Sequence, residues 1–216
     1  MLKVLSDKKS IFHQFLAELR DVNAQKDSMR FRRNIERIGE LFAYEISKEL
    51  SYTEKVVQTP LGTIVQSFPE KPVLANVLRA GLPLHQGLLN YFDGAENAFI
   101  SAYRKHVASD DSFEVKVEYL TSPDITNKTI VLADSMLATG TSMLLAYQAL
   151  LTKGIPKHIH LVSVIASQQA VNKVMEELKN VSFTLWIGAI DQELNAQSYI
   201  VPGLGDAGDL SFGKKL

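Results

Sequence analysis

From residue 72 onward the sequence alternates short apolar runs with segments of helical periodicity, and this alternation constrains the fold more than any other feature. The clearest run is Thr129–Ala133 (TIVLA), and a helix is predicted after it over about 141–152. A second run, 159–166, precedes a helix that ends near Leu178, and a further strand covers 183–187. Parallel strands are buried on both faces and therefore read as continuous apolar runs. The sequence predicts an α/β fold with a mostly parallel central sheet flanked by helices.

The loops that follow the predicted strands are the expected place for a site. Val73–Leu78 is a short apolar strand followed by a helix over 81–91, and 99–103 and 113–120 are predicted strands. Ligands of such sheets bind beyond the carboxyl ends of the strands. We therefore expect functional residues after Leu78, Tyr103, Ala133 and Ile187.

The first part of the chain predicts two amphipathic helices and a β-hairpin arm. The helices cover 10–20 and a segment that starts after Asp27. The second helix carries several arginines, which indicate either a phosphate-binding patch or, the favoured interpretation, a solvated helix face; they are Arg30, Arg32, Arg33 and Arg37. Residues 55–68 form strand, turn and strand. Because an isolated hairpin is marginally stable, we expect the arm to pack on a neighbour or on a second subunit of a homo-oligomer (a dimer or larger).

No repeat, low-complexity tract or Pro/Gly/Ser-rich linker divides the chain, so residues 1–216 are predicted to form a single domain. The formal net charge of −1 argues against nucleic acid as a partner. The absence of cysteine excludes disulfides and thiol catalysis. The N-terminus has no apolar signal region and no stretch approaches membrane-spanning length, so we expect a cytoplasmic protein without a membrane partner.

The segment 129–142, TIVLADSMLATGTS, joins a buried strand to a helix through small and hydroxyl-bearing residues. Backbone N–H groups at a helix start are unpaired and favour a phosphate. Thr139, Thr141 and Ser142 add hydroxyl donors, and Gly140 lets the backbone approach an anion closely. Asp134 is an acceptor when ionised and suits the two hydroxyls of a ribose. The pattern indicates a ribose 5-phosphate site, although an ordinary strand–helix connection with a capping hydroxyl has the same spacing.

This stretch resembles the phosphoribosyl-diphosphate (PRPP) loop of type I phosphoribosyltransferases, and DSMLATGTS is similar to the uracil-specific form DPMLATGGS. The chain departs from that form at Ser135, which replaces proline, and at Thr141, which replaces glycine. It also lacks the second acidic residue that most other type I enzymes carry beside the first. The resemblance implies that PRPP is bound by Asp134, Ser135, Met136, Leu137, Ala138, Thr139, Gly140, Thr141 and Ser142.

Two arginines lie near strand ends, Arg79 in LRAGLP and Arg104 in YRKH. A single arginine at a loop start is usually surface charge. Two arginines beside a phosphate cradle can each bind phosphate oxygens bidentately, as a pyrophosphate leaving group requires. The resemblance assigns the pyrophosphate contacts, and with them a catalytic role, to Arg79 and Arg104.

The C-terminal stretch YIVPGLGDAGD places three glycines within a short span, which predicts that neither a helix nor a strand runs through Gly203, Gly205 and Gly208. Such a loop exposes main-chain donors and acceptors, and uracil requires donor, acceptor and donor. A mobile chain end is the alternative interpretation. The motif is the hallmark of uracil phosphoribosyltransferases. The resemblance therefore implies a small C-terminal base-binding hood over about 189–216 in which uracil contacts Ile200, Gly205, Asp206 and Ala207.

The resemblance also implies the reaction, in which uracil and PRPP give UMP and pyrophosphate, as in pyrimidine salvage. No protein nucleophile is needed, because positioning and charge neutralisation carry the catalysis. Magnesium would be held through PRPP rather than by a protein site, with Asp206 near both and catalytic by its position. A mobile flap is expected within 105–124. The alternatives are a phosphoribosyltransferase for another base, a regulatory RNA-binding relative, and a non-catalytic sugar-phosphate-binding domain. His158 and His160 are predicted to be structural.

Overall fold

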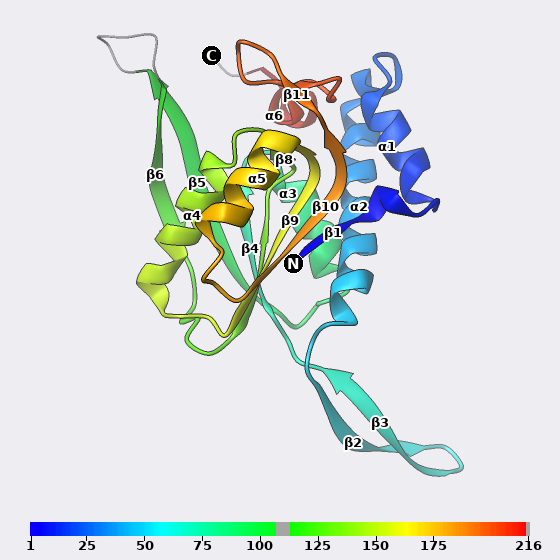
Figure 1. Ribbon diagram of the computed structural model, residues 1–216. Coiled ribbons are helices and arrows are strands. Elements are labelled where there is room, and N and C mark those ends of the chain that lie inside the picture. Colours follow the sequence, from blue (N-terminus) through cyan, green and yellow to red (C-terminus); the bar gives the residue numbers. More distant parts are fainter. Residues whose placement is uncertain (107–112, 215–216) are drawn as a thin grey trace.

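The computed structural model describes residues 1–106 and 113–214, with side chains described for 1–101 and 117–214 (Figure 1). Its central sheet has the strand order β1-β10-β9-β7-β4-β5-β6, and β8 pairs with β9. The strands are β1 (Leu2–Val4), β4 (Val73–Leu78), β5 (Glu96–His106), β6 (Phe113–Thr121), β7 (Thr129–Ala133), β8 (Met136–Leu137), β9 (His158–Ser167) and β10 (Phe183–Asp191). Only the β5–β6 pair is antiparallel among these pairings. The predicted mostly parallel sheet is confirmed.

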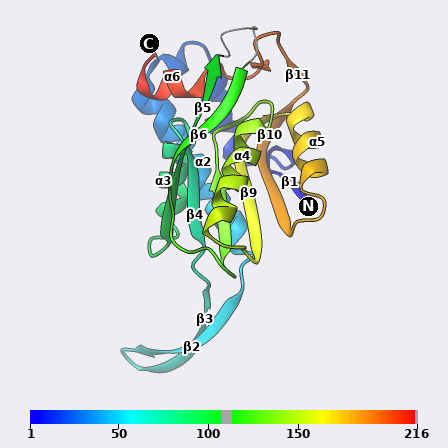
Figure 2. The same cartoon turned by 90° about the vertical axis from the view of Figure 1, so that its left-hand side faces the viewer.

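Helices cover both faces of this sheet, as Figures 1 and 2 show. They are α1 (Phe12–Arg20), α2 (Ser28–Ser47), α3 (Gly81–Leu89), α4 (Thr141–Leu150), α5 (Gln168–Glu177) and α6 (Ala207–Phe212), with short 3-10 helices η1 (Leu5–Asp7), η2 (Ala24–Lys26) and η3 (Leu151–Lys153). Strand β7 shows why both faces must be covered. Val131 and Ala133 face the core beneath α1, α2 and α3, whereas Ile130 and Leu132 face the core beneath α4 and α5. The apolar run TIVLA therefore reflects burial on two sides.

The strand order contains a topological switch point. After β1 at one edge, the chain forms β4, adds β5 and β6 on one side of it, and then adds β7, β9 and β10 on the other. The helices α3 and α4 that follow β4 and β7 therefore lie on opposite faces, and ligands of such sheets bind beyond the carboxyl ends of the two strands at this point. The segments after Leu78 and Ala133 begin at these ends.

Several strands differ from the sequence prediction. Strand β1 was not predicted. It pairs with β10, with Leu2 opposite Leu185. So short a segment carries no strand pattern of its own and becomes a strand because the edge of the sheet supplies its backbone partners. Strand β10 continues to Asp191 rather than ending at 187. Strand β5 continues to His106, so the prediction that Arg104 follows a strand end is wrong. Pairing of Arg104 with Val115 on β6 extends the strand past it.

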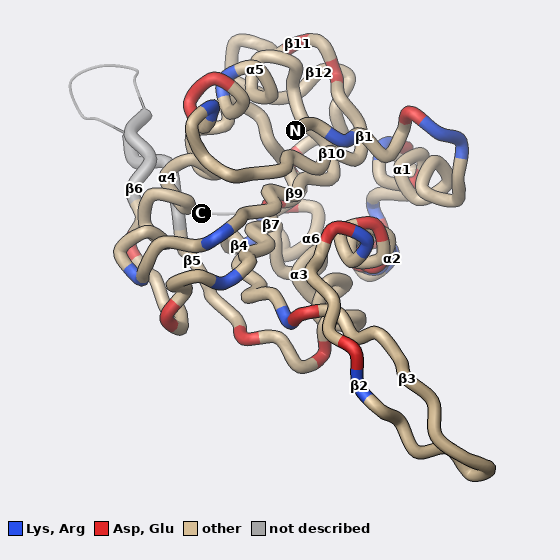
Figure 3. Tube along the Cα trace, turned by 60° about the horizontal axis from the view of Figure 1, so that its bottom comes forward, with Lys and Arg blue, Asp and Glu red and all other residues tan. Residues whose placement is uncertain are grey.

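The predicted hairpin is present as β2 (Tyr52–Thr59) and β3 (Gly62–Pro69), which project away from the rest of the chain (Figure 1). Both of its faces carry exposed apolar side chains, and Figure 3 shows charge only near its base. The base is fixed by Glu70, whose carboxylate accepts hydrogen bonds from Thr129 Oγ1 at 2.8 Å and Lys157 Nζ at 2.5 Å. The arm therefore starts from a rigid attachment and then loses contact with its own core.

The C-terminal segment is folded as β11 (Glu193–Leu194), β12 (Ile200–Val201) and α6, the last packed against α2. The prediction that no helix runs through Gly208 is wrong, because this glycine lies in the first turn of α6. The Asp206 side chain caps that helix by accepting a hydrogen bond from the Asp209 N–H at 3.0 Å, and such a cap stabilises a short helix. None of the helices described is long and apolar enough to cross a membrane.

Candidate active site

Backbone hydrogen bonds to the neighbouring strand β9 fix the position of the loop after β7. The Asp134 N–H donates to the Val162 carbonyl at 3.0 Å, and the Ser135 carbonyl accepts from Val164 and Ile165 at 3.2 and 3.4 Å. Met136 and Leu137 then form β8, with Leu137 buried in the core. The predicted packing of these two residues beneath the loop is confirmed, so their side chains support the loop rather than face a ligand.

The carboxyl group of Asp134 lies in an environment that disfavours its charge. Desolvation by burial raises its pKa to about 7, although the backbone N–H groups of Met136 and Ser135 act in the opposite direction. A ligand that donates hydrogen bonds to this carboxyl would favour the ionised form. Asp134 is thus arranged to gain its charge when hydroxyl donors arrive.

The start of α4 has the geometry of an anion cradle. Its N-cap, Gly140, has φ = +77°, a left-handed conformation that side chains rarely adopt. The first-turn N–H groups of the helix have no intrahelical partners. The hydroxyls of Thr139 and Thr141 lie 3.2 Å apart, and Ser142 is partly exposed beside them. The three hydroxyl-bearing residues lie at the start of α4, and their role toward a phosphate stays a prediction.

Residues at the β9–α5 junction and in α5, which the sequence analysis did not identify, support this loop. Ser167 Oγ donates to the Ala138 carbonyl at 2.6 Å and accepts from the Ala170 N–H at 3.0 Å, so one hydroxyl fixes the loop and caps α5. A Cβ added at Gly140 would lie 3.3 Å from Val174 and 3.5 Å from the Ala170 carbonyl oxygen. A serine just before a predicted helix is the only sequence signal for this role.

Arg79 begins the second loop at the switch point, and its peptide bond with Leu78 is cis. The loop lies against the end of β7, because a Cβ added at Gly81 would be 3.2 Å from the Ala133 carbonyl oxygen. The Arg79 and Asp134 loops are therefore neighbours. The Arg79 guanidinium contacts Asp209 Oδ1 at 3.2 Å and the Gly213 carbonyl at 3.4 Å, which ties it to the C-terminal segment.

Parts of the prediction fall on chain that the structure does not describe. The side chain of Arg104 and the flap residues 107–112 lie outside the described residues. Two surface hollows measure about 410 and 370 Å³, and the second lies on the C-terminal segment. The first is lined by Glu18, Asn23, Ala24, Asp27 and Arg30, and the second by Ile190, Asp191, Gln192, Glu193, Val201 and Pro202.

The residues predicted to contact a base divide into buried and accessible groups. The side chains of Ile200 and Ala207 are buried in the core beneath α1–α3, so only their backbone could meet a ligand. Gly205 is exposed with φ = +86°, and Asp206 is partly exposed. This arrangement fits recognition through main-chain groups.

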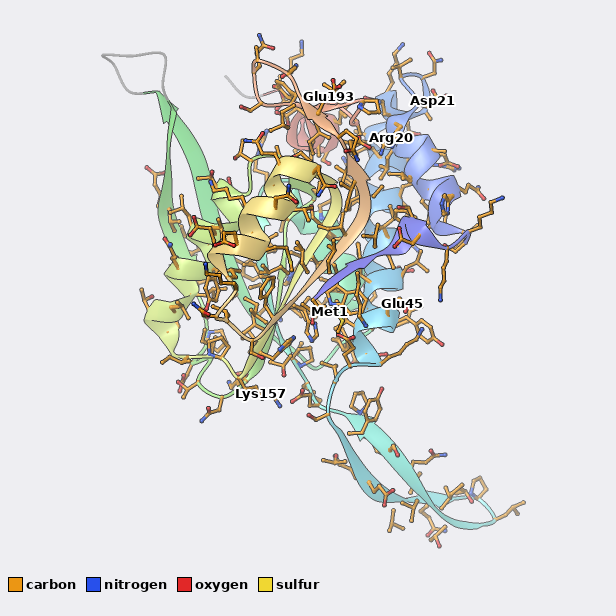
Figure 4. The ribbon with its side chains drawn as sticks, in the orientation of Figure 1. Met1, Arg20, Asp21, Glu45, Lys157 and Glu193 are labelled. Atoms are coloured by element: carbon orange, nitrogen blue, oxygen red, sulfur yellow. The ribbon has the colours of Figure 1, made fainter. Side chains whose placement is uncertain are left out.

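A partly buried ion pair holds this segment in shape and was not predicted. Arg20 at the end of α1 binds both carboxylate oxygens of Asp191 at 2.8 Å and donates to the Gly203 carbonyl at 2.9 Å, while the Gly203 N–H donates to Asp191 at 2.8 Å. Burial alone would raise the pKa of Asp191, but the hydrogen bonds from Arg20 and Gly203 outweigh it and lower that pKa. Figure 4 labels Arg20 at the end of α1 near Glu193 of β11. The sequence analysis expected functional residues after Ile187, which is the only prediction that bears on Asp191.

The arginines of α2 have intramolecular partners. Arg30 binds Glu18, and this bond, followed by that from Asn34, lowers the pKa of Glu18 to about 2. Arg32 donates to the Ser211 carbonyl at 2.6 Å, and Arg33 and Arg37 contact residues of their own helix. The favoured interpretation, a purely solvated face, is therefore incomplete.

His158 and His160 have structural partners, as predicted. His158 hydrogen-bonds Ser182 and Thr184, and Trp186 Nε1 donates to His160 Nδ1 at 3.0 Å. Desolvation by burial, followed by the neighbouring His158, lowers the pKa of His160 to about 4. Among the described residues no group of three or more His, Asp or Glu side chains could hold a metal ion.

Comparison with known proteins identifies the family. The family described as uracil phosphoribosyltransferase matches residues 5–214. A uracil phosphoribosyltransferase of Porphyromonas gingivalis (strain ATCC 33277) is 56% identical, covering 98% of this chain and 98% of its own. That of Pyrococcus furiosus is 35% identical and covers 93% and 85%.

Solved structures agree in fold. The AQ2163 protein from Aquifex aeolicus matches with a TM-score of 0.88 at 26% identity over 100% of both chains. The protein TT1426 from Thermus thermophilus has a TM-score of 0.51 at 15% identity over 85% and 90%, which shows a shared fold alone. The match over almost the whole length, joined to the switch-point loops and the folded C-terminal segment, means that this chain belongs to the uracil phosphoribosyltransferase family.

Proposed function

We propose that this chain transfers the phosphoribosyl group of PRPP to N1 of uracil, forming UMP and releasing pyrophosphate. The observation that carries the proposal is the meeting of the Arg79 loop, the Asp134 loop and the C-terminal segment at one end of the sheet. Arg79 contacts Asp209 of that segment directly. The reaction requires a leaving-group site, a sugar-phosphate site and a base site side by side.

Each site has a defined chemical task in this proposal. Asp134 accepts hydrogen bonds from the ribose hydroxyls, and the start of α4 binds the 5′-phosphate with its N–H groups and hydroxyls. Arg79 and Arg104 neutralise the departing pyrophosphate. Backbone groups of 200–207 orient uracil so that N1 faces the ribose C1′ atom. The C1′–pyrophosphate bond breaks as the N1–C1′ bond forms, and the N1 proton leaves to solvent or to pyrophosphate.

Magnesium fits this arrangement as a substrate-bound ion. Mg²⁺ is commonly held by one or two carboxylates together with substrate phosphates and water. Asp206 is partly exposed at the start of α6, close in sequence to the Arg79 partner Asp209. Its Oδ1 caps that helix, so in this proposal it lies near the PRPP-bound ion rather than forming a separate protein site for it. When bound, the ion would neutralise charge on PRPP.

We further propose that the chain forms a homo-oligomer through its hairpin arm and acts in the cytoplasm on uracil and PRPP. The arm exposes Val56 (72%) and Leu61 (100%), which a second subunit would cover. The lack of cysteine is consistent with a reducing compartment.

The function is tested by incubating the protein with magnesium, PRPP and each nucleobase in turn. We expect UMP from uracil, with cytosine and purines at least about a hundredfold poorer in kcat/KM, because a mismatched base leaves buried polar groups unpaired. The Arg79→Ala variant should be folded but weak toward PRPP. Equal turnover of cytosine would refute the base assignment, and efficient turnover of hypoxanthine would refute the proposed activity.

A further inference from the structure

A lysine on α5 reaches the phosphate loop. Lys173 Nζ lies 3.0 Å from Thr141 Oγ1, at the first residue of α4. Lys173 is one helical turn beyond Ala170, and both Ala170 and Val174 pack against Gly140. Positions i, i+3 and i+4 share a helix face, so this face of α5 follows the loop.

The hydrogen bonds around Thr141 fix the direction in which its hydroxyl can act. An ammonium group can only donate, so Thr141 Oγ1 accepts from Lys173. Thr139 Oγ1 donates to the same oxygen at 3.2 Å and accepts from the Thr141 N–H at 3.5 Å. With both acceptor sites of its oxygen used, the Thr141 hydroxyl has only its proton left to offer.

Charge supports the same conclusion. The loop from Asp134 to Ser142 contains no lysine or arginine. Lys173 is exposed, and within the described part of the chain its only hydrogen-bond partner is Thr141, with no carboxylate in ion-pair contact. Among the described side chains, Lys173 of α5 is the cation in hydrogen-bond contact with the cradle, where a dianionic 5′-phosphate would meet it.

We propose that Lys173 binds the 5′-phosphate of PRPP and UMP together with Thr141, whose hydroxyl it turns into a donor toward the phosphate. This inference rests on the proposed function, because it assigns residues to the sugar-phosphate part of that site. Thr141, which departs from the family's usual glycine, is explained as the link between loop and lysine.

The test compares Lys173→Ala, Lys173→Arg and the matched control Lys179→Ala, which changes an exposed lysine paired with Glu176 after the end of α5. We expect the KM for PRPP and the Kd for UMP to rise about five- to tenfold in Lys173→Ala. The variant loses a charge-assisted hydrogen bond, and the expected effect is modest because the lysine is exposed to solvent. The values of kcat and of KM for uracil should stay within about twofold, the Arg variant should recover most of the loss, and Lys179→Ala should match the wild type.

A double variant tests the link through Thr141. In a Thr141→Gly background, Lys173→Ala should have a smaller effect than in the wild type, because neighbours that act together are not additive. Two results would overturn the inference: an unchanged affinity of Lys173→Ala for UMP, or an equal loss of its affinity for uridine, which has no phosphate. In either case, UMP synthesis by the wild type would still support the proposed function. If the wild type made no UMP, the function would fail, and binding of ribose 5-phosphate to both proteins would still decide the role of Lys173.

Discussion

At the scale of single residues, the Asp134 carboxyl connects the fold to ligand binding. Its burial beside the loop raises its pKa to about 7, and only the N–H groups of Met136 and Ser135 oppose that shift. A ribose diol needs an ionised acceptor. Binding of PRPP should therefore be linked to the loss of one proton near neutral pH.

This linkage predicts two pH dependences. The affinity for PRPP should rise about tenfold between pH 6 and pH 8, as Asp134 ionises around its pKa of about 7. Without ligand, the raised pKa contributes stability that is fully present below the ordinary pKa of about 4 and is lost as the pH rises through 7. Denaturant titrations at pH 5 and pH 8 measure the second effect. Asp134→Asn is the control. PRPP titrates in the same way with both proteins, whereas the effects of Asp134 on PRPP affinity and on stability should both be absent from the variant.

Ser135, which replaces the family's proline, should be a neutral variation. Its carbonyl is bonded to β9, and its buried hydroxyl has no hydrogen-bond partner among the described residues. Its N–H acts on the Asp134 carboxyl, where it is the smaller of the two backbone bonds that lower the pKa. Proline removes that N–H and the unbonded hydroxyl, and the uracil-specific form of the loop, which carries proline here, works without both. Ser135→Pro should therefore change kcat/KM by less than about tenfold, or about 1.4 kcal/mol, whereas Asp134→Asn should do far worse. An inactive but folded Ser135→Pro together with an active Asp134→Asn would show that the loop binds its ligand in another way.

At the scale of secondary-structure elements, the β2–β3 arm is the clearest sign of assembly. On one of its faces Val56 lies opposite Val65, and on the other Val57 lies opposite Ile64. An arm that folded back onto its own core would bury one face. Because apolar side chains are exposed on both, a second copy of the chain is the expected partner.

The prediction for the arm is that Val65→Glu weakens the oligomer. A charge placed opposite Val56 would have to be desolvated on association, which is costly. Sedimentation equilibrium or light scattering should show a shift toward monomer at micromolar concentration. Val22→Glu is the matched control, because Val22 is 68% exposed outside the arm. Equal association of Val65→Glu and the wild type would remove the arm from the interface.

At the scale of the whole molecule, three distant segments meet at one ion pair. Arg20 ends α1, Asp191 ends β10, and Gly203 lies in the C-terminal segment. Gly203 has φ = +61°, and a Cβ added there would be 2.1 Å from the Ile200 carbonyl oxygen, so this turn is tight. The pair therefore sets the shape of the C-terminal segment from the opposite end of the sequence.

Asp191→Asn should lower the free energy of unfolding at pH 7 by about 1.5–3 kcal/mol, the usual contribution of a charged hydrogen bond. The lowered pKa of Asp191 means that its contribution is present above the ordinary pKa of about 4 and is lost as the pH falls through the folded-state value. The variant and the wild type should converge in stability at acid pH. The KM for uracil should rise more than that for PRPP. A variant as stable as the wild type at pH 7, with unchanged KM for uracil, would contradict this role.

The sequence by itself determined the parallel sheet, the two loops and the arm. Each follows from neighbours along the chain: TIVLA needs burial on both faces, glycine at position 140 permits a left-handed turn before α4, and Pro60–Leu61–Gly62 turns a hairpin. The motifs also determined the family, which the match over 5–214 confirms.

Only the tertiary structure decided the contacts between segments far apart in sequence. The helices α2 and α3 cross so closely that a Cβ added at Gly87 would lie 1.9 Å from the Glu36 carbonyl oxygen, a requirement that no local pattern announces. No local pattern singles out Arg20, Asp191 or Lys173 either, because their partners come from other segments of the folded chain. The physical reason is that local periodicity records burial and backbone conformation, whereas an ion pair or a helix crossing depends on which distant atoms the folded chain brings within bonding distance.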